Sequence, residues 1–363
     1  MSRSADRTVV LGAGLMGRLL ACELARVGHA VELYDASTPE APASAAHVAA
    51  AMLAPLAESA VTELGVVRMG CHALARWPEL IATLGAPVYF QQQGTLVLWH
   101  RQDAPEATRF QQQLAHTAHA MPQLSAVERL DARAVARLEP ALGERFAQGL
   151  YLPGEGQLDN RELLAALLHR LQTLGVALHW SSPRSPADFA DHPGWLFDCR
   201  GLGARSDWQA LRGVRGEVIR VHAPEVTLTR PTRLLHPRYP LYIAPKPGGV
   251  FVIGATEIES DDASPASVRS TLELLSAAYT VHPGFAEARV IEMAAQCRPT
   301  LRDNLPALRW LGPRRLQING LYRHGYLIAP AMLDAVMQCV DSGHSALAES
   351  FALRVESATG AAA

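Results

Sequence analysis

The chain has few cysteines, and no two of them are spaced like a metal-binding pair. Its 363 residues contain five, at Cys22, Cys71, Cys199, Cys297 and Cys339. The odd number and wide spacing argue against a disulfide framework and a zinc ribbon, and they favour a reducing compartment. The 14 histidines show no metal-ligand spacing with acids or cysteines, so the sequence predicts no metal site.

The chain also lacks net charge and long apolar runs. Its 33 Lys and Arg residues nearly balance 35 Asp and Glu residues, so the composition gives no broad field for binding nucleic acid or an anionic membrane. The segment most like a membrane-spanning helix, residues 45–55, is rich in alanine. It is shorter than the roughly 18 apolar residues that a spanning helix requires. The first residues show no signal-peptide pattern. We therefore expect a cytoplasmic protein that acts on a small molecule and binds neither nucleic acid nor membrane.

A glycine-rich turn near the N-terminus is the most informative motif. It follows an apolar run at residues 8–11, and it consists of Gly12, Ala13, Gly14, Leu15, Met16 and Gly17. In a dinucleotide-binding turn the first glycine allows the tight bend, the second admits the pyrophosphate, and the third lets the following helix pack on the strand. A second predicted strand, residues 31–34, ends at Asp35, whose carboxylate can accept hydrogen bonds from an adenosine ribose. The unit predicts an adenine dinucleotide and leaves open whether it is a nicotinamide or a flavin.

The rest of the chain alternates between helical and strand-like patterns. Leucines at helical spacing predict a helix over residues 158–174, with Asp159 at its start and Gly175 past its end. A strand-like run at 194–199 enters a turn at Gly201, which suggests a second backbone approach to the cofactor. Residues 214–221, 241–244 and 249–255 indicate an antiparallel sheet. Further helices are expected at 111–126, 267–279 and 330–340.

Seven segments together match the pattern of a known family. They are GAGLMG (12–17), AAAMLAP (49–55), EGQLDNRELLAAL (155–167), RGEVI (215–219), YIAPKPGG with IGATE (242–257), RPTLRDNLPAL (298–308) and NGLYRHGYLIAP (319–330). In this order they resemble the flavin-dependent amino-acid oxidases of the D-amino acid oxidase superfamily, and within it the glycine oxidases of thiamine biosynthesis. The resemblance implies a mixed α/β (α+β) fold. A Rossmann-like FAD-binding domain, residues 1–85, 150–213 and 299–357, would be interleaved with a substrate domain built on an antiparallel sheet, residues 86–149 and 214–298.

The resemblance also implies which residues contact a noncovalent FAD. Ala51, Met52 and Leu53 would lie against the isoalloxazine ring, and relatives carry glycine where this chain has Ala51. A later loop would pass the pyrimidine edge, where a cation or N–H groups stabilise the negative charge of a reduced flavin. That loop holds Arg323, His324, Gly325, Tyr326 and Leu327. Leu321 and His324 depart from the family pattern. Related sarcosine oxidases attach flavin through a cysteine near the position of Cys297, but the Arg-Pro pattern beside Cys297 is that of the noncovalent branch.

The motif of Arg298 and Pro299 implies the substrate site. In relatives this arginine anchors the carboxylate of an amino acid, because a guanidinium can bind both oxygens at once. Tyr242 matches a tyrosine whose hydroxyl donates to the same carboxylate, and Arg323 is the third candidate catalytic residue. The plainer interpretations are a surface arginine and a packing tyrosine. His324 is not assigned a base role, since hydride transfer needs none. Glu257 fits an active site and a solvated loop equally well.

The implied reaction is oxidation of glycine or another small amino acid or amine. Hydride transfer from Cα to flavin N5 would give an imine, then an oxoacid and ammonia, while dioxygen yields hydrogen peroxide. One alternative is a D-amino-acid or sarcosine-type dehydrogenase with an electron acceptor other than oxygen. Arg298 and Tyr242 in their motifs argue against a flavin-binding protein without catalysis, and the late glycine loop at 320–325 argues against a nicotinamide dehydrogenase. Because relatives are often oligomers, a homo-oligomer is a further expectation.

Overall fold

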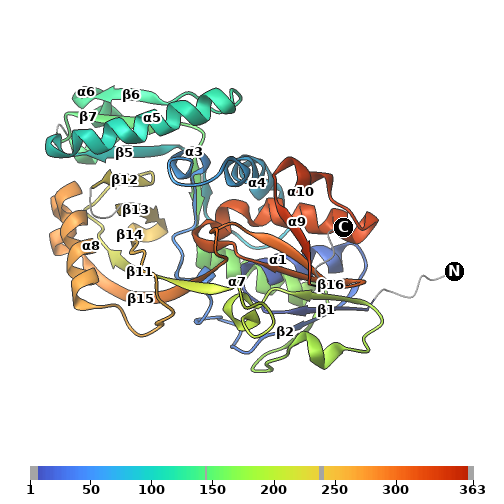
Figure 1. Cartoon of the computed structure of the whole chain (residues 1–363). Coiled ribbons are helices and arrows are strands. Elements are labelled where there is room, and N and C mark those ends of the chain that lie inside the picture. The colour runs from blue at the N-terminus through green and yellow to red at the C-terminus, as the bar shows by residue number, and fades with distance from the viewer. Residues whose placement is uncertain (1–6, 144, 237–240, 359–363) are drawn as a thin grey trace.

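The computed structural model describes residues 7–143, 145–236 and 241–358. The strands of this part of the chain form three sheets of seven, eight and three strands. In Figure 1 the seven-stranded sheet and its helices lie on the right, and the eight-stranded sheet with helix α8 lies on the left. The expected mixed α/β fold is therefore confirmed. None of the described helices is both long and apolar enough to cross a membrane.

The seven-stranded sheet carries the N-terminal glycine turn. Five neighbouring strands in it run parallel, and their apolar runs are buried because helices cover the sheet. The order is β18 (Arg354–Ser357), β16 (Ala307–Gly312), β17 (Arg315–Asn319), β10 (Trp195–Asp198), β1 (Arg7–Leu11), β2 (Ala30–Tyr34) and β9 (Ala177–His179). The helices are α1 (Leu15–Arg26), α4 (Leu64–Ala82), α7 (Asn160–Thr173), α9 (Gly325–Ser342) and α10 (Ala346–Ser350). Since the sheet joins three distant parts of the sequence, its core forms only when all three are present.

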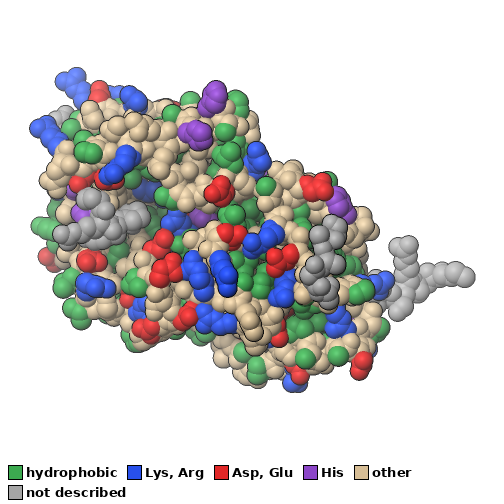
Figure 2. Space-filling view, viewed as in Figure 1, with side chains coloured by type: hydrophobic (Ala, Val, Ile, Leu, Met, Phe, Trp, Pro, Cys, Tyr) green, Lys and Arg blue, Asp and Glu red, His purple; other side chains and the backbone are tan. Residues whose placement is uncertain are grey.

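The eight-stranded sheet is antiparallel except where β12 and β5 run parallel. Its order is β15 (Arg289–Thr300), β11 (Arg212–His222), β14 (Val250–Gly254), β13 (Leu241–Lys246), β12 (Thr232–Leu235), β5 (Thr95–Trp99), β7 (Gln148–Leu152) and β6 (Glu128–Asp131). Helix α8 (Val268–Val281) packs on β11, β13 and β14. Helices α5 (Ala104–Ala120) and α6 (Ala132–Leu138) belong to the same half of the molecule. On the face seen in Figure 2, basic and acidic side chains of the described residues are intermixed.

A small third sheet ties the two large ones together. It consists of β3 (Met52–Leu53), β8 (Gly156–Leu158) and β4 (Phe90–Gln91), and short helices α2 (Ala45–Val48) and α3 (Pro55–Glu58) flank β3. Lys246 reaches this sheet from the end of β13. Its ammonium donates to the carbonyl oxygens of Ala50 at 2.8 Å and Leu158 at 2.6 Å and to Gln157 Oε1 at 3.1 Å. Lys246, on the eight-stranded sheet, therefore fixes the backbone of the segment that precedes β3.

Several predicted elements need correction. The helix expected at 158–174 is present as α7, with Asp159 accepting from the backbone N–H groups of Arg161 and Glu162. The helix expected at 111–126 begins earlier, at Ala104, with a proline in its first turn, and it ends at Ala120. Strands β6, β7, β8 and β12 were not expected.

The last long helix was also placed wrongly, because Pro330 was taken as its start. Helix α9 begins at Gly325, and Pro330 lies inside it. A proline cannot donate to the carbonyl four residues earlier, which belongs to Tyr326. The buried indole of Trp77 in α4 donates to that carbonyl instead, at 2.9 Å. The side chain of a neighbouring helix therefore replaces the missing backbone hydrogen bond.

Candidate active site

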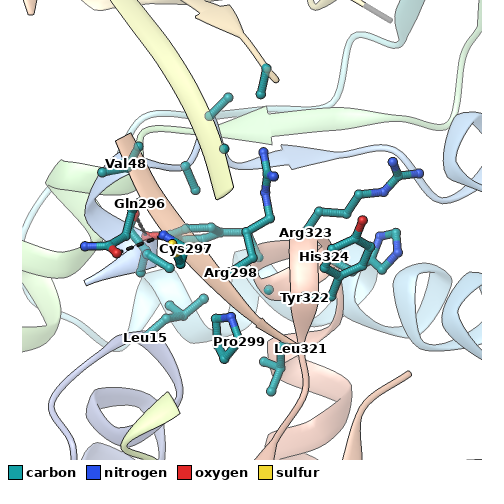
Figure 3. Close-up of a pocket in the computed structure, with 18 of the residues that line it drawn as sticks. Leu15, Val48, Gln296, Cys297, Arg298, Pro299, Leu321, Tyr322, Arg323 and His324 are labelled. Carbon is teal, nitrogen blue, oxygen red and sulfur yellow. Dashed lines mark hydrogen bonds between the residues drawn. The ribbon is translucent and has the colours of Figure 1, made fainter. Parts of the chain in front are cut away.

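One large cavity extends from the glycine turn to Arg298. Its volume is about 1170 Å³, which exceeds the usual range of ~300–1000 Å³ for small-molecule sites. The wall at one end includes Gly12, Gly14 and Asp35, and the wall at the other includes Tyr242 and Arg298. Figure 3 shows Leu15, at the start of α1, and Arg298, on β15, lining the same pocket. The cavity therefore has room for a dinucleotide and a small substrate together.

The glycine turn has the geometry that a pyrophosphate needs. Gly12 has φ +91°, and a Cβ there would lie 2.7 Å from the Cys199 carbonyl oxygen. A Cβ on Gly17 would lie 1.8 Å from the Gly12 carbonyl oxygen, so only glycine lets α1 begin this close to β1. Gly14 caps α1 with no side-chain hydrogen bond, and the nearest atom to a Cβ there is 3.4 Å away. The first N–H groups of α1 thus remain available to an anion in the cavity.

The acid after β2 lies beside this turn. Asp35 accepts from the backbone N–H of Ala13 through Oδ2 and from that of Ser37 through Oδ1, the latter at 2.7 Å. Its carboxylate lines the cavity next to Gly12. The residues present therefore fit the adenosine half of an FAD molecule.

The other predicted cofactor residues are mostly at the wall. The cavity is lined by Leu15, Met16, Ala51, Met52, Gly201, Arg323, His324, Gly325, Tyr326 and Leu327. Three predicted contacts do not line it: Ala13 and Leu53 are fully buried behind the wall, and Gly17 packs against the turn. The predicted pyrimidine-edge loop is a short 3₁₀ turn, Tyr322–His324, followed directly by the first turn of α9.

Ala51 holds a backbone conformation that favours glycine. Its φ is +53°, and the residue is buried. Such a conformation costs an L-residue roughly 1–2 kcal/mol, whereas glycine adopts it freely. Alanine at this position therefore leaves strain in the segment beside the cavity.

We expect Ala51→Gly to stabilise the protein by about 0.5 kcal/mol, because the relieved strain exceeds the added chain entropy of the unfolded state. Thermal unfolding of the apoprotein measures this. Ala54→Gly is the matched control, since Ala54 is equally buried but has φ −129°. The control should lose about 0.5–1 kcal/mol. Equal losses in both variants would contradict the strain at Ala51.

At the other end of the cavity, the predicted side chains of Arg298 and Tyr242 each lie over a glycine of a neighbouring strand. The Arg298 guanidinium crosses β11 at Gly216, where a Cβ would lie 2.1 Å from Nη2. It donates to the carbonyl oxygens of Thr256 at 3.1 Å and Arg215 at 3.3 Å. The Tyr242 hydroxyl lies over Gly254, where a Cβ would lie 2.7 Å away. These glycines, in the RGEVI and IGATE motifs, explain how both side chains reach one place.

Next to Tyr242 the sheet carries Arg233, which the sequence did not suggest. Arg233 on β12 is the direct cross-strand neighbour of Tyr242 on β13. Its Nη2 binds Glu58 Oε1 at 2.6 Å, and Glu58 belongs to the short helix α3. Glu58 Oε2 also lies 3.0 Å from Arg323 Nη2 and 3.5 Å from His324 Nδ1. A buried carboxylate thus joins the sheet to the turn before α9.

Glu58 is ionised in this setting. Burial alone would raise its pKa, but Arg323 and Arg233 outweigh burial and hold the pKa of the Glu58 carboxyl well below its usual range. Burial lowers the pKa of His324 to about 4, so its ring is neutral at physiological pH. Burial raises the pKa of Tyr242, so its hydroxyl remains a donor.

Glu257 completes this group and faces the cavity. It binds Arg323 Nη1 at 2.8 Å, and Arg323 with Tyr322 lowers the pKa of Glu257 despite burial, which opposes the shift. We call Glu58, Arg233, Tyr242, Glu257, Arg298 and Arg323 the charged end of the cavity. Figure 3 shows Arg298, Tyr322, Arg323 and His324 gathered there. Among the described residues, Arg298 is the arginine of this end that has no acidic partner.

Cys297 lines the cavity, and its thiol packs against backbone carbonyl groups. Its Sγ lies 3.4 Å from the Asp262 carbonyl oxygen and 3.6 Å from that of Ser260. Burial raises the pKa of the thiol, which disfavours the reactive thiolate. The residue is buried, and its contacts are those of a packed side chain.

Comparison with known proteins identifies the family of this chain. A family model described as DAO, FAD dependent oxidoreductase, matches residues 7–336. A Rhizobium etli protein named as a thiamine biosynthesis oxidoreductase, ThiO, is 42% identical over 337 residues, which cover 91% of this chain and 95% of that one. A glycine oxidase of Geobacillus kaustophilus is 27% identical over 347 residues, covering 88% of this chain and 89% of that one.

Solved structures share the fold. The crystal structure of glycine oxidase from Geobacillus kaustophilus matches with a TM-score of 0.78 at 24% identity, over 94% of this chain and 96% of that one. Iminodiacetate oxidase from Chelativorans sp. BNC1 matches with a TM-score of 0.80 at 22% identity, over 96% and 99%. The predicted resemblance is confirmed: the chain belongs to the DAO family and is an FAD-dependent oxidoreductase.

Proposed function

We propose that this protein oxidises glycine or another small amine with one carboxylate, in the manner of a glycine oxidase of thiamine biosynthesis. The observation that carries the proposal is Arg298, a cavity-lining guanidinium without an acidic partner among the described residues. An uncompensated guanidinium in a partly buried site favours a carboxylate ligand. The names of the Rhizobium etli and Geobacillus kaustophilus relatives support this substrate class and this pathway.

Each residue of the charged end has a proposed task. Arg298 binds the substrate carboxylate through both oxygens, and Tyr242 donates its hydroxyl to the same group. Glu58 and Glu257 hold Arg323 in place. His324 is neutral and therefore adds no charge. With its carboxylate fixed at this end, the substrate extends toward the middle of the cavity.

The cofactor would be bound noncovalently along the cavity, from the glycine turn to the turn before α9. The glycine turn and the N-terminus of α1 would hold the pyrophosphate, Asp35 the ribose, and residues 51–52 with 323–327 the flavin. When bound, FAD supplies the chemistry by accepting a hydride from the substrate Cα and passing electrons to dioxygen, which gives hydrogen peroxide. The oxidised substrate is an imine, which water converts into an oxoacid and ammonia.

The domain division follows the two large sheets in this proposal. Residues 1–85, 150–213 and 299–357 would form the FAD-binding domain, and the sheet strands β1, β2, β9, β10 and β16–β18 fall within these ranges. Residues 86–149 and 214–298 would form the substrate domain. Three strands of the eight-stranded sheet cross these boundaries: β7 after Gly149, β11 at its first two residues and β15 at its last two. Residues 1–6, at the start of the first range, lie outside the described part of the chain. The cytoplasmic location and homo-oligomeric assembly stay predictions.

Anaerobic mixing of the purified flavoprotein with glycine, sarcosine or D-alanine tests the proposal. We expect at least one of them to bleach the flavin absorbance, and admission of air to restore the absorbance with formation of peroxide. Bleaching without peroxide would instead indicate a dehydrogenase that uses another electron acceptor. A flavin that stays oxidised with all three amines would contradict the proposed function.

A further inference from the structure

The charged end contains more cations than one carboxylate needs. Arg233, Arg298 and Arg323 all line the cavity. The charges of all three arginines act on the Tyr242 hydroxyl, as does that of Glu58, so these groups surround one point. Three guanidinium groups in one partly buried place would attract ligands with several negative charges.

Glu58 and Glu257 remove most of this attraction. Glu58 bridges Arg233 and Arg323, at 2.6 Å and 3.0 Å, and Glu257 binds Arg323 at 2.8 Å. The two acids cancel two of the three arginines, which leaves one net positive charge at Arg298. A second carboxylate on the substrate would find no uncompensated cation and would face two ionised acids.

Four further titratable groups near this end, His324, Glu106, Arg109 and Glu155, add no unpaired cation to the cavity wall. His324 is neutral, and Glu106 and Arg109, toward α5, pair with each other. Glu155 lies fully buried behind α3 and accepts from the Ala57 N–H at 2.7 Å. Burial raises the pKa of Glu155 to about 7, so at pH 8 this carboxyl carries a charge. It does not line the cavity, and a ligand there does not contact it.

We propose that Glu58 determines substrate selectivity by limiting the charged end to amines with a single carboxylate. The inference rests on the proposed function and deepens it. Glu58 occupies the Nη2 groups of both Arg233 and Arg323, at 2.6 Å and 3.0 Å. When Glu58 loses its charge, these two arginines become a second carboxylate site beside Arg298.

The test compares ligands that differ by one carboxylate. Acetate and malonate are non-oxidisable, and their dissociation constants follow from perturbation of the flavin absorbance at pH 8. Sarcosine and iminodiacetate are the matching substrates, because iminodiacetate carries a carboxylate on the methyl group of sarcosine. The variants are Glu58→Gln, the charge-restoring pair Glu58→Gln with Arg233→Gln, and the control Glu79→Gln, whose side chain is 67% exposed on α4.

We expect Glu58→Gln to shift the ratio of acetate to malonate dissociation constants by about tenfold or more toward malonate, since the added charge acts twice on a dianion. The ratio of kcat/KM for iminodiacetate to kcat/KM for sarcosine should rise by a similar factor. The double variant should return both ratios to near the wild-type values, and Glu79→Gln should leave them unchanged. If Glu58→Gln does not fold, Glu257→Gln makes the same change of charge at a side chain that is 46% exposed.

Two results would separate failure of the inference from failure of the proposed function. If Glu58→Gln and Glu257→Gln both keep the acetate-to-malonate ratio within about twofold of wild type, the charge balance does not set selectivity. If no amine reduces the wild-type flavin, the proposed function fails. The inhibitor ratio still tests the role of Glu58 in that case, because it needs no turnover.

Discussion

Replacing Arg298 by methionine should raise the KM for a single-carboxylate amine by about a hundredfold or more and leave FAD bound. Truncating one partner of a buried charge pair costs roughly 2–5 kcal/mol, and each 1.4 kcal/mol is about tenfold in affinity. Arg298 is the cation of the charged end that no described acid neutralises, so its loss leaves the carboxylate without a counter-charge. Steady-state kinetics with glycine or sarcosine, together with acetate binding, measure the effect.

Arg298→Lys is the control, because lysine keeps the positive charge but lacks the planar pair of donors of a guanidinium. We expect it to recover part of the affinity, because an ammonium binds one oxygen well but not both. Gly216→Ala, on the neighbouring strand β11, tests whether the position of the Arg298 guanidinium matters, since the new Cβ would occupy the place of that guanidinium. Unchanged KM values in Arg298→Met would refute carboxylate binding at this residue.

Gly17→Ala should abolish FAD binding although Gly17 does not line the cavity. The new Cβ would meet the Gly12 carbonyl oxygen, a backbone atom that cannot turn aside. Helix α1 would have to move away from the turn, which costs about 1–3 kcal/mol of stability and displaces the N–H groups offered to the pyrophosphate. FAD content after purification and the thermal midpoint of the apoprotein measure both effects.

Gly14→Ala is the matched comparison, because the nearest atom to its Cβ is the Ser44 hydroxyl oxygen at 3.4 Å. This variant should fold with wild-type stability as the apoprotein and still bind FAD more weakly, since the methyl group lies where the pyrophosphate approaches. If Gly17→Ala binds FAD as well as Gly14→Ala does, the third glycine is not required for packing α1 on the strand.

Local patterns predicted the parts of the fold that are determined locally. The strand, glycine turn, helix and acid at residues 8–35 form one continuous unit, and α7 begins and ends at its predicted capping residues. The start of α9 could not be predicted in this way. A proline usually marks the first turn of a helix, and the hydrogen bond from the distant Trp77 to the Tyr326 carbonyl could not be read from the local sequence.

The site shows the same limit. Arg298 and Tyr242 could be predicted as site residues because they lie in recognisable motifs. Glu58 gave no signal, because its partners Arg233 and Arg323 are 175 and 265 positions away in the sequence. The one available hint was an acid three residues after the apolar AAAMLAP segment. Likewise, the glycines at 216 and 254 look like ordinary strand glycines until the side chains that cross them are known.

The interleaved course of the chain affects when the cofactor can be taken up. The glycine turn at residue 12 leaves the ribosome long before Arg298, which follows 286 positions later, and before α9, which packs on α1 and α4. Sheet strands from the last fifth of the chain complete the same layer as β1. A nascent chain lacks part of the cavity wall, so we expect FAD to bind only after nearly the whole polypeptide has left the ribosome. The concentration of FAD in the cell would then determine how many completed chains carry the cofactor, and not how the chain folds during synthesis.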